Sequence, residues 1–136
     1  MPPLKLALCG YGLVGQRHVS AARHVDGVVV RHVIEPTAAG RAAAEQAGLA
    51  CYHDLDSLMA ATKVDGLVIA TPTSLHREQT LAALQHGCPV LVEKPIATTS
   101  DEARAIVSAV KNSGVPVLGG HHRRHNPLIQ KARQMI

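Results

Sequence analysis

Three glycines at the end of an apolar run have the spacing Gly-x-Gly-x-x-Gly, in the segment Cys9-Gly10-Tyr11-Gly12-Leu13-Val14-Gly15. A helical pattern follows, which is the setting in which this spacing binds a dinucleotide. Gly10 can make the tight turn, Gly12 can let the backbone approach a pyrophosphate, and Gly15 can let the helix pack closely on the strand. The helix N-terminus would offer its free N–H groups and positive dipole to the phosphates. We therefore predict that residues 10–15, with Tyr11, Leu13 and Val14, bind a pyrophosphate.

Glu35 lies twenty residues after Gly15, at the end of the second apolar run. A carboxylate at that place can accept hydrogen bonds from the adenosine ribose and repels a 2′-phosphate. The pattern therefore favours NAD. NADP is the alternative, because Arg31 and Arg41 lie nearby in the sequence and either could weaken this preference. The competing interpretation is a glycine-rich turn with an incidental surface glutamate.

Two further motifs follow apolar runs in the second half of the chain. Thr71-Pro72-Thr73 comes after Gly66–Ala70, and Glu93-Lys94-Pro95 comes after Pro89–Val92. Ligands bind at the carboxyl ends of parallel strands, and a lysine there can hydrogen-bond a reacting hydroxyl and help its proton to leave.

Each of these motifs also has an ordinary structural explanation. Ser74 could merely cap a helix that places His76 on the surface. Glu93 and Lys94 could form a solvated ion pair.

Short apolar runs alternate with helical segments along the chain, which predicts repeated βαβ units and a parallel sheet covered on both faces. The expected strands are Leu4–Cys9, Val28–Ile34, Ala50–His53, Gly66–Ala70, Pro89–Val92 and Val115–Leu118. The expected helices are Leu13–Val25, Thr37–Ala47, Ser57–Ala61 with Ser57 as its cap, Ser74–His86, Ser100–Ser113 and Pro127–Ile136.

Composition excludes several classes of protein. Of 136 residues, 46% are hydrophobic and 18% charged, and the aromatic residues are two tyrosines. A packed core is expected, whereas aromatic-lined lectins and base-stacking nucleic-acid modules are disfavoured. The net charge is +4, but the one basic cluster, residues 121–125, has no interleaved aromatics, so nucleic acid is not the predicted partner. Histidines 121 and 125 are four apart, yet the flanking glycines and proline and the lack of a third ligand predict no metal site.

Cys9, Cys51 and Cys88 are too few and too far apart for a disulfide framework or a zinc knuckle. Reduced thiols in a cytoplasmic protein are the expectation. The apolar runs are shorter than a membrane span or a signal peptide requires, so no membrane association is predicted.

These motifs together resemble the N-terminal NAD(P)-binding domain of the glucose–fructose oxidoreductase, inositol dehydrogenase and MocA-type oxidoreductase family. The matching segments cover nearly the whole chain in the family's order. They are residues 10–15 with His18, Asp65–His76, Glu93–Pro95 and Gly120–Pro127. Thr73 departs from the family's more usual Asn, and His121-His122 replaces a more usual aromatic or Asn pair.

The resemblance implies a Rossmann-type doubly wound sheet with strand order 3-2-1-4-5-6 between two helical layers, an α/β/α fold. It implies that Thr71, Pro72, Thr73 and His76 lie along the cofactor. It places Glu93 and Lys94 at the nicotinamide, with Lys94 as the catalytic residue. The implied reaction is hydride transfer between a nicotinamide and a secondary alcohol or carbonyl of a sugar, cyclitol or related small molecule.

Family members are longer than this chain, so residues 1–120 are expected to form the dinucleotide-binding domain. Residues 121–136 would then lead toward a second domain, absent from this chain, that carries most substrate contacts. We expect this chain to bind cofactor without turnover and to self-associate through apolar surface that the second domain would cover. The alternatives are a non-catalytic NAD(P)-sensing module, which would not need Lys94, and a basic nucleic-acid-associated protein.

Overall fold

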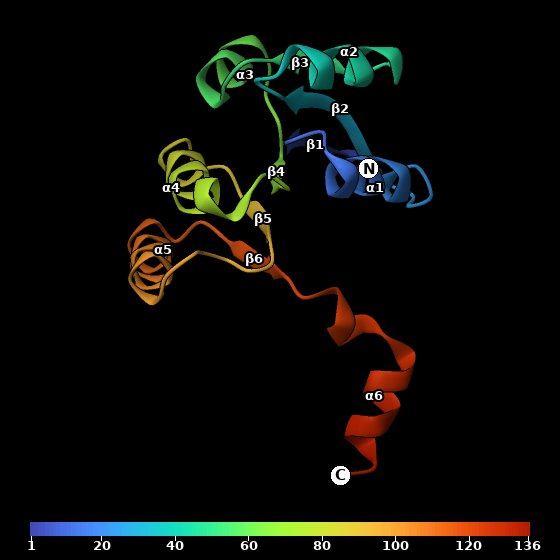
Figure 1. Cartoon of the computed structure of the whole chain (residues 1–136), viewed down its shortest axis with the longest axis vertical. Coiled ribbons are helices and arrows are strands. Elements are labelled where there is room, and N and C mark those ends of the chain that lie inside the picture. The colour runs from blue at the N-terminus through green and yellow to red at the C-terminus, as the bar shows by residue number, and fades with distance from the viewer.

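Six parallel strands form one sheet in the order β3-β2-β1-β4-β5-β6 (Figure 1). The computed structural model describes residues 1–136. The strands are β1 (Leu4–Cys9), β2 (Val28–Ile34), β3 (Ala50–Tyr52), β4 (Gly66–Ile69), β5 (Val90–Glu93) and β6 (Val117–Gly120). The strand order reverses between β1 and β4, which is where such sheets open a crevice at their carboxyl edge. The predicted fold class and strand order are confirmed.

Alternate residues of the central strands pack on opposite faces of the sheet, as the two-residue period of a strand requires. On β1, Leu8 packs with Val19 of α1 and Ala44 of α2, whereas Ala7 and Cys9 pack on the other face. That other face meets α3 and α4, whose buried residues include Leu58. The strands are thus covered by apolar side chains on both sides, and the three-layer α/β/α arrangement follows.

The helices match the predicted segments closely, with small shifts at their ends. They are α1 (Leu13–Ala22), α2 (Ala38–Gln46), α3 (Leu55–Ala61), α4 (His76–Gln85), α5 (Ser100–Ser113) and α6 (Pro127–Gln134). Two single 3-10 turns, η1 (Thr73–Leu75) and η2 (His122–His125), precede α4 and α6.

Two predicted helix starts are wrong. Asp54, not Ser57, caps α3. The Asp54 carboxylate accepts from Ser57 N–H, and the hydroxyl of Ser57, the third residue of the helix, accepts from Asp54 N–H. Ser74 lies inside η1 and does not cap α4, which begins at His76. Asp54 caps α3 because Asp is as good an N-cap residue as Ser, and because the Asp54 and Ser57 side chains can each accept a hydrogen bond from the backbone N–H of the other residue.

The last segment leaves the body of the molecule. Figure 1 shows the chain running from β6 through η2 to α6, which projects away from the sheet. Every residue of α6 is exposed, including its apolar Leu128 and Ile129. The domain boundary at residue 120 stays a prediction. None of the six helices combines the length and the apolar character needed to cross a bilayer.

Candidate functional site

The glycine turn between β1 and α1 is shaped by backbone crowding. Gly10 has a φ of +89°, and a side chain there would meet the Ala70 carbonyl at 3.0 Å. A Cβ on Gly15 would lie 2.1 Å from the carbonyl oxygen of Gly10, so only glycine lets the helix approach the turn. A Cβ on Gly12 would have no neighbour within 4 Å. The first and last glycines are thus needed for the fold, while the middle one keeps open space above the backbone.

The N-terminus of α1 faces that open space. Gly12 is its N-cap, so no side chain at this position covers the helix N-terminus. The first N–H groups of a helix have no partner inside the helix, so here they remain free for a ligand. The side chains of Leu13 and Val14 are exposed. The turn can therefore bind an anion through backbone N–H groups and the helix dipole.

Glu35 joins this turn to the loop after β2. Its carboxylate accepts hydrogen bonds from Tyr11 N at 2.9 Å, from Thr37 N at 2.9 Å and from the Thr37 hydroxyl at 2.7 Å. The residue is 7% exposed, which rules out the incidental surface glutamate. A carboxylate has about four acceptor sites, so these three bonds leave capacity for a ribose hydroxyl.

Burial raises the pKa of Glu35, but opposing contacts outweigh it. The hydrogen bonds from Thr37 and Tyr11, together with the nearby Arg41 guanidinium, bring the pKa below its ordinary value. Arg41 itself donates to the carbonyl oxygens of Glu35 and Pro36. Glu35 is therefore held as an anion at the end of β2.

Gly40 is a residue that the sequence reasoning missed. A Cβ at this position would lie 2.5 Å from the carboxyl carbon of Glu35. Gly40 thus makes room on α2 for the Glu35 side chain. The sequence does carry a signal for it. A glycine within an alanine-rich helix is less stable than an alanine would be, so its presence indicates that a neighbouring group needs the space.

A cleft of about 580 Å³ opens between the glycine turn and the loops after β2 and β4. Gly12, Glu35 and Thr37 line one side, and Thr71 and Pro72 line the other. Two of the predicted site residues after β4 do not line it. Thr73 lies in η1 outside the cleft, and His76 is 1% exposed.

His76 instead bridges two loops inside the protein. Its Nδ1 lies 2.9 Å from the Pro95 carbonyl oxygen and its Nε2 lies 2.9 Å from the Thr71 carbonyl oxygen. The surface position considered for His76 is therefore wrong. The ring holds the loop after β4 against the loop after β5, and so positions both sides of the crevice without facing it.

A second cavity, of about 460 Å³, lies on the other side of the glycine turn. It shares Ala70 and Thr71 with the first cleft. The side chains around it that can do chemistry are Arg17, His18, Glu93, Lys94 and His122. The two cavities thus meet at Ala70 and Thr71, at the end of β4, beside the point where the strand order reverses.

Glu93 pairs with His18 and not with Lys94. Glu93 Oε1 lies 2.8 Å from His18 Nε2, and the Lys94 backbone N–H donates to the other carboxylate oxygen. The solvated Glu93–Lys94 ion pair is therefore wrong. Gly120 of β6 makes room for this carboxylate, since a Cβ there would lie 3.2 Å from it. Lys94 remains exposed and free of any carboxylate within 4 Å.

The profile of the oxidoreductase family with an NAD-binding Rossmann fold matches residues 4–121. The chain belongs to this family. Its residues fit the cofactor: the backbone above Gly12 is open to a pyrophosphate and Glu35 has acceptor capacity for a ribose. The domain is therefore an NAD-binding Rossmann domain.

Known proteins match nearly the full length of this chain. It is 32% identical over 135 residues to a 4-carboxy-2-hydroxymuconate-6-semialdehyde dehydrogenase of Sphingobium sp., covering 98% of this chain and 43% of the relative. It is 33% identical to the rhizopine catabolism protein MocA of Rhizobium meliloti, covering 100% and 43%. The crystal structure of the WlbA dehydrogenase of Bordetella pertussis, in complex with NADH and UDP-GlcNAcA, superposes with a TM-score of 0.91 at 29% identity, covering 98% and 40%. The chain thus spans less than half the length of these relatives.

The two glycines allow a matched test of fold against binding. Gly12→Ala should leave the unfolding free energy nearly unchanged, because nothing surrounds the new methyl group. It should weaken NAD binding about tenfold or more, because that methyl group occupies the space over the helix N-terminus. Gly15→Ala should lower the unfolding free energy by about 1–3 kcal/mol through overpacking. Urea unfolding measures the unfolding free energy, and calorimetric titration measures the affinity for NAD. Equal effects of the two substitutions would contradict a binding role for Gly12 and a packing role for Gly15.

Glu35 predicts a specific loss of stability in acid. Its pKa is lowered in the folded state, so its stabilising effect is complete above the ordinary value of 4.5 and is lost as the pH falls through the folded-state pKa. Glu35→Gln should lower the unfolding free energy by about 1–3 kcal/mol at pH 7. In urea titrations, the difference in unfolding free energy between wild type and Glu35→Gln should become smaller as the pH falls toward 3. Glu45→Gln, which alters an exposed carboxylate of α2, is the control; a gap for Glu35→Gln that does not change with pH would refute the assignment.

Proposed function

We propose that this chain is the nucleotide-binding half of an oxidoreductase that transfers a hydride between nicotinamide C4 and a secondary alcohol or carbonyl carbon. The substrate class is a sugar, cyclitol or related small molecule. The observation that supports this most strongly is Lys94, whose free ammonium group lines the cavity on the far side of the glycine turn from Glu35.

The proposed binding follows from the two cavities. The first N–H groups of α1 bind the pyrophosphate and Glu35 accepts from the adenosine ribose. The nicotinamide half then lies beside Glu93 and Lys94. Thr71 borders both halves, and its hydroxyl donates to Gln79 Oε1 at 2.6 Å, which orients the side chain. NAD, when bound, supplies the hydride acceptor.

Lys94 is the proposed catalytic residue. As an ammonium group it can donate a hydrogen bond to a carbonyl oxygen, and as an amine it can accept the hydroxyl proton of an alcohol. The hydroxyl proton of the alcohol would go to Lys94 Nζ, and the carbon that bears this hydroxyl would lose its hydride to the nicotinamide, which is the chemistry the cofactor would supply. Glu93, fixed by His18, orients the backbone N–H of Lys94 and so the start of its side chain.

The 136-residue chain by itself is proposed to bind NAD without meaningful turnover. It spans 43% of the length of its curated relatives. Lys94 is exposed on an open cavity, whereas hydride and proton transfer are favoured in a site that excludes water. A cytoplasmic location belongs to the same proposal, supported by three free thiols. Burial raises the pKa of one of these, Cys9, to about 12, which makes it inert.

A thermal-shift titration with NAD, NADH, NADP and NADPH tests this function. NAD and NADH should stabilise the chain by about 2.7 kcal/mol at a hundred times the dissociation constant, which is several degrees for a domain of this size. NADP and NADPH should raise the melting temperature less than NAD and NADH, because the Glu35 carboxylate repels a 2′-phosphate. The same sample incubated with NAD and myo-inositol should form no NADH by absorbance. A folded sample that responds to none of the four would refute the binding, and turnover would refute the inactivity.

We also propose that the chain self-associates. An apolar groove of about 400 Å³ runs beside α1 and reaches Leu118, which is 64% exposed. Leu128 of α6 is 78% exposed. Exposed apolar surface of this kind favours association. Light scattering should give a dimer or larger species, and the double substitution Leu118→Gln and Leu128→Gln should shift it toward monomer. A wild-type chain that is monomeric at high concentration would count against the proposal.

A further inference from the structure

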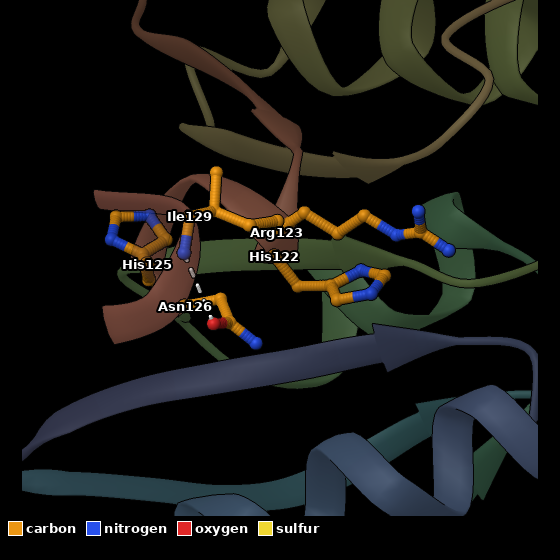
Figure 2. A pocket seen from close by; sticks show the side chains of 5 residues that line it. All are labelled: His122, Arg123, His125, Asn126 and Ile129. Carbon is orange, nitrogen blue, oxygen red and sulfur yellow. Dashed lines mark hydrogen bonds between the residues drawn. The ribbon is translucent and has the colours of Figure 1, made fainter. Parts of the chain in front are cut away.

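Basic side chains line a cavity at each of two opposite edges of the sheet. One cavity, of about 530 Å³, is formed by η2 and α6, and Figure 2 shows its lining: His122, Arg123, His125, Asn126 and Ile129. His122 also lines the Lys94 cavity, so this cavity belongs to the cofactor side of the molecule. The other, of about 240 Å³, lies where β1 begins and α3 ends. It shares no lining residue with the cofactor cleft or the Lys94 cavity.

This second cavity, which we call the amino-edge cavity, is lined by hydrogen-bond donors. Its polar lining consists of Lys5 of β1, Arg31 and His32 of β2, and Thr62 at the end of α3. The first three can carry positive charge, and the Thr62 hydroxyl can donate a hydrogen bond. Asp65, whose carboxylate accepts from the Lys5 backbone N–H at 2.8 Å, lines the apolar groove beside α1 instead. The amino-edge cavity therefore has no carboxylate in its lining.

A β-bulge brings Arg31 and His32 into the same cavity. Leu6 pairs with Val30, but the next residue of β1 pairs with His32. Arg31 is thus the extra residue on β2. Val30 and Val33 both pack in the core beside α1 and α2, although they are three residues apart. The two basic residues between them are therefore turned away from that core together, against the usual alternation of a strand. Bulges redirect side chains in this way, often next to functional sites.

The His32 ring is oriented by Tyr52 of β3. Its Nδ1 lies 3.3 Å from the Tyr52 hydroxyl, and the two ring centres are 5.8 Å apart. Its Nε2 makes no hydrogen bond within the protein. When the hydroxyl donates to Nδ1, the neutral ring carries its proton on Nε2 and can donate it to a ligand, and a protonated ring donates from both nitrogens. The ring can therefore bind an anion in either protonation state.

The positive charge of the amino-edge cavity has no counter-charge in the protein. The side chains of Lys5, Arg31 and His32 have no carboxylate within 4 Å, since the three ion pairs of the structure involve other cations. Burial, and then repulsion from the Arg31 guanidinium and the Lys5 ammonium group, lower the pKa of His32 below its ordinary value. Like charges gathered in a cleft attract anions. A bound anion would therefore relieve the repulsion between these three side chains.

We propose that the amino-edge cavity is a second anion site, which binds a phosphate group either as the free ion or as part of a small ester. Arg31 supplies paired N–H donors that match the phosphate oxygens, Lys5 supplies a further positive charge, and His32 supplies a ring donor. From its place in the sequence, Arg31 was a candidate for the 2′-phosphate of NADP. It lines the amino-edge cavity and not the cofactor cleft. The site goes beyond the proposed function, because it lies apart from the residues that would hold NAD.

A titration followed by NMR tests the site residue by residue. The isotope-labelled chain is titrated at about pH 6, where a histidine is partly protonated, with inorganic phosphate and with glycerol 3-phosphate. Sodium chloride at matched ionic strength is the reference. The backbone amide signals of residues 5, 31, 32 and 62 should shift and saturate with phosphate but not with chloride. An anion at the glycine turn shifts the signals of residues 12–15 instead. The phosphate that binds more tightly identifies the source of the ligand.

Arg31→Gln and Arg77→Gln form a matched pair of variants. Each removes one positive charge from an exposed arginine, but only Arg31 lines the amino-edge cavity. Both side chains are exposed, so the melting temperature should stay unchanged and shows that each variant is folded. Arg31→Gln should weaken phosphate binding at residues 5, 31, 32 and 62 about tenfold, as expected for hydrogen bonds between charged groups. Arg77→Gln should leave it nearly unchanged.

Sulfate tests the part played by His32, because sulfate stays doubly charged between about pH 5 and pH 8. The charged and titratable groups around the ring are Lys5 on β1, Arg31 on β2 and Tyr52 on β3, and Thr62 on α3 is neutral. Histidine is the one among them that ordinarily titrates in this range. A bound dianion favours the protonated ring, so sulfate should raise the pKa of His32, read from its ring protons. Sulfate should correspondingly bind more tightly as the pH falls.

Three results would overturn the amino-edge site. The first is a set of phosphate-induced shifts confined to residues 12–15. The second is an equal loss of phosphate affinity in Arg31→Gln and Arg77→Gln. The third is a pKa of His32 that sulfate changes no more than chloride does at the same ionic strength. Each is read on the cofactor-free chain, so none of them depends on whether NAD binds.

Discussion

The close approach of α1 to the turn after β1 is the constraint on which the site depends. A side chain at Gly15 would overlap the Gly10 carbonyl oxygen, so the helix can start where it does only without one. That placement aims the free N–H groups of α1 at the crevice where the strand order reverses. It also sets Tyr11 N where the Glu35 carboxylate can accept from it. Backbone crowding at one turn therefore positions both the N–H groups and the carboxylate that we propose to bind the pyrophosphate and the adenosine ribose.

Three side chains then hold neighbouring loops together around the crevice. Glu35 joins the glycine turn to the loop after β2, His76 joins the loops after β4 and β5, and the His18–Glu93 contact joins α1 to the end of β5. Each uses its polar atoms on protein partners. The groups left without a protein counter-charge, among them Lys94 and Arg31, are those available to a ligand. Glu35 differs from the other two because its three protein hydrogen bonds leave the carboxylate an acceptor site for a ligand.

Much of the fold could be predicted because its signals are local. Each expected apolar run overlaps a strand, and α5 has the predicted bounds with a capping box at Thr99. The last strand, Val117–Gly120, begins and ends two residues later than the predicted Val115–Leu118. The wrong start at Ser57 arose where two good capping residues, Asp54 and Ser57, lie within one turn. Which one caps depends on the path of the incoming chain, and that path is set by the sheet and not by the helix sequence. At α4 the 3-10 turn η1 leads directly into the helix, and Leu75 occupies the N-cap position without a side-chain bond.

The sequence by itself determined the alternation of strands and helices, the glycine turn, the acid at residue 35 and the lysine at residue 94, because periodicity and motif spacing are properties of short segments. The strand order was implied by the resemblance to a known family. Tertiary structure alone decided which partners these groups have. His18 and Glu93 are 75 residues apart, and nothing in either segment shows that they meet at 2.8 Å or that Lys94 is thereby left free. The need for Gly40 and the burial of His76 were decided in the same way. Contacts between distant segments depend on how the layers pack, and packing is set by the whole chain at once.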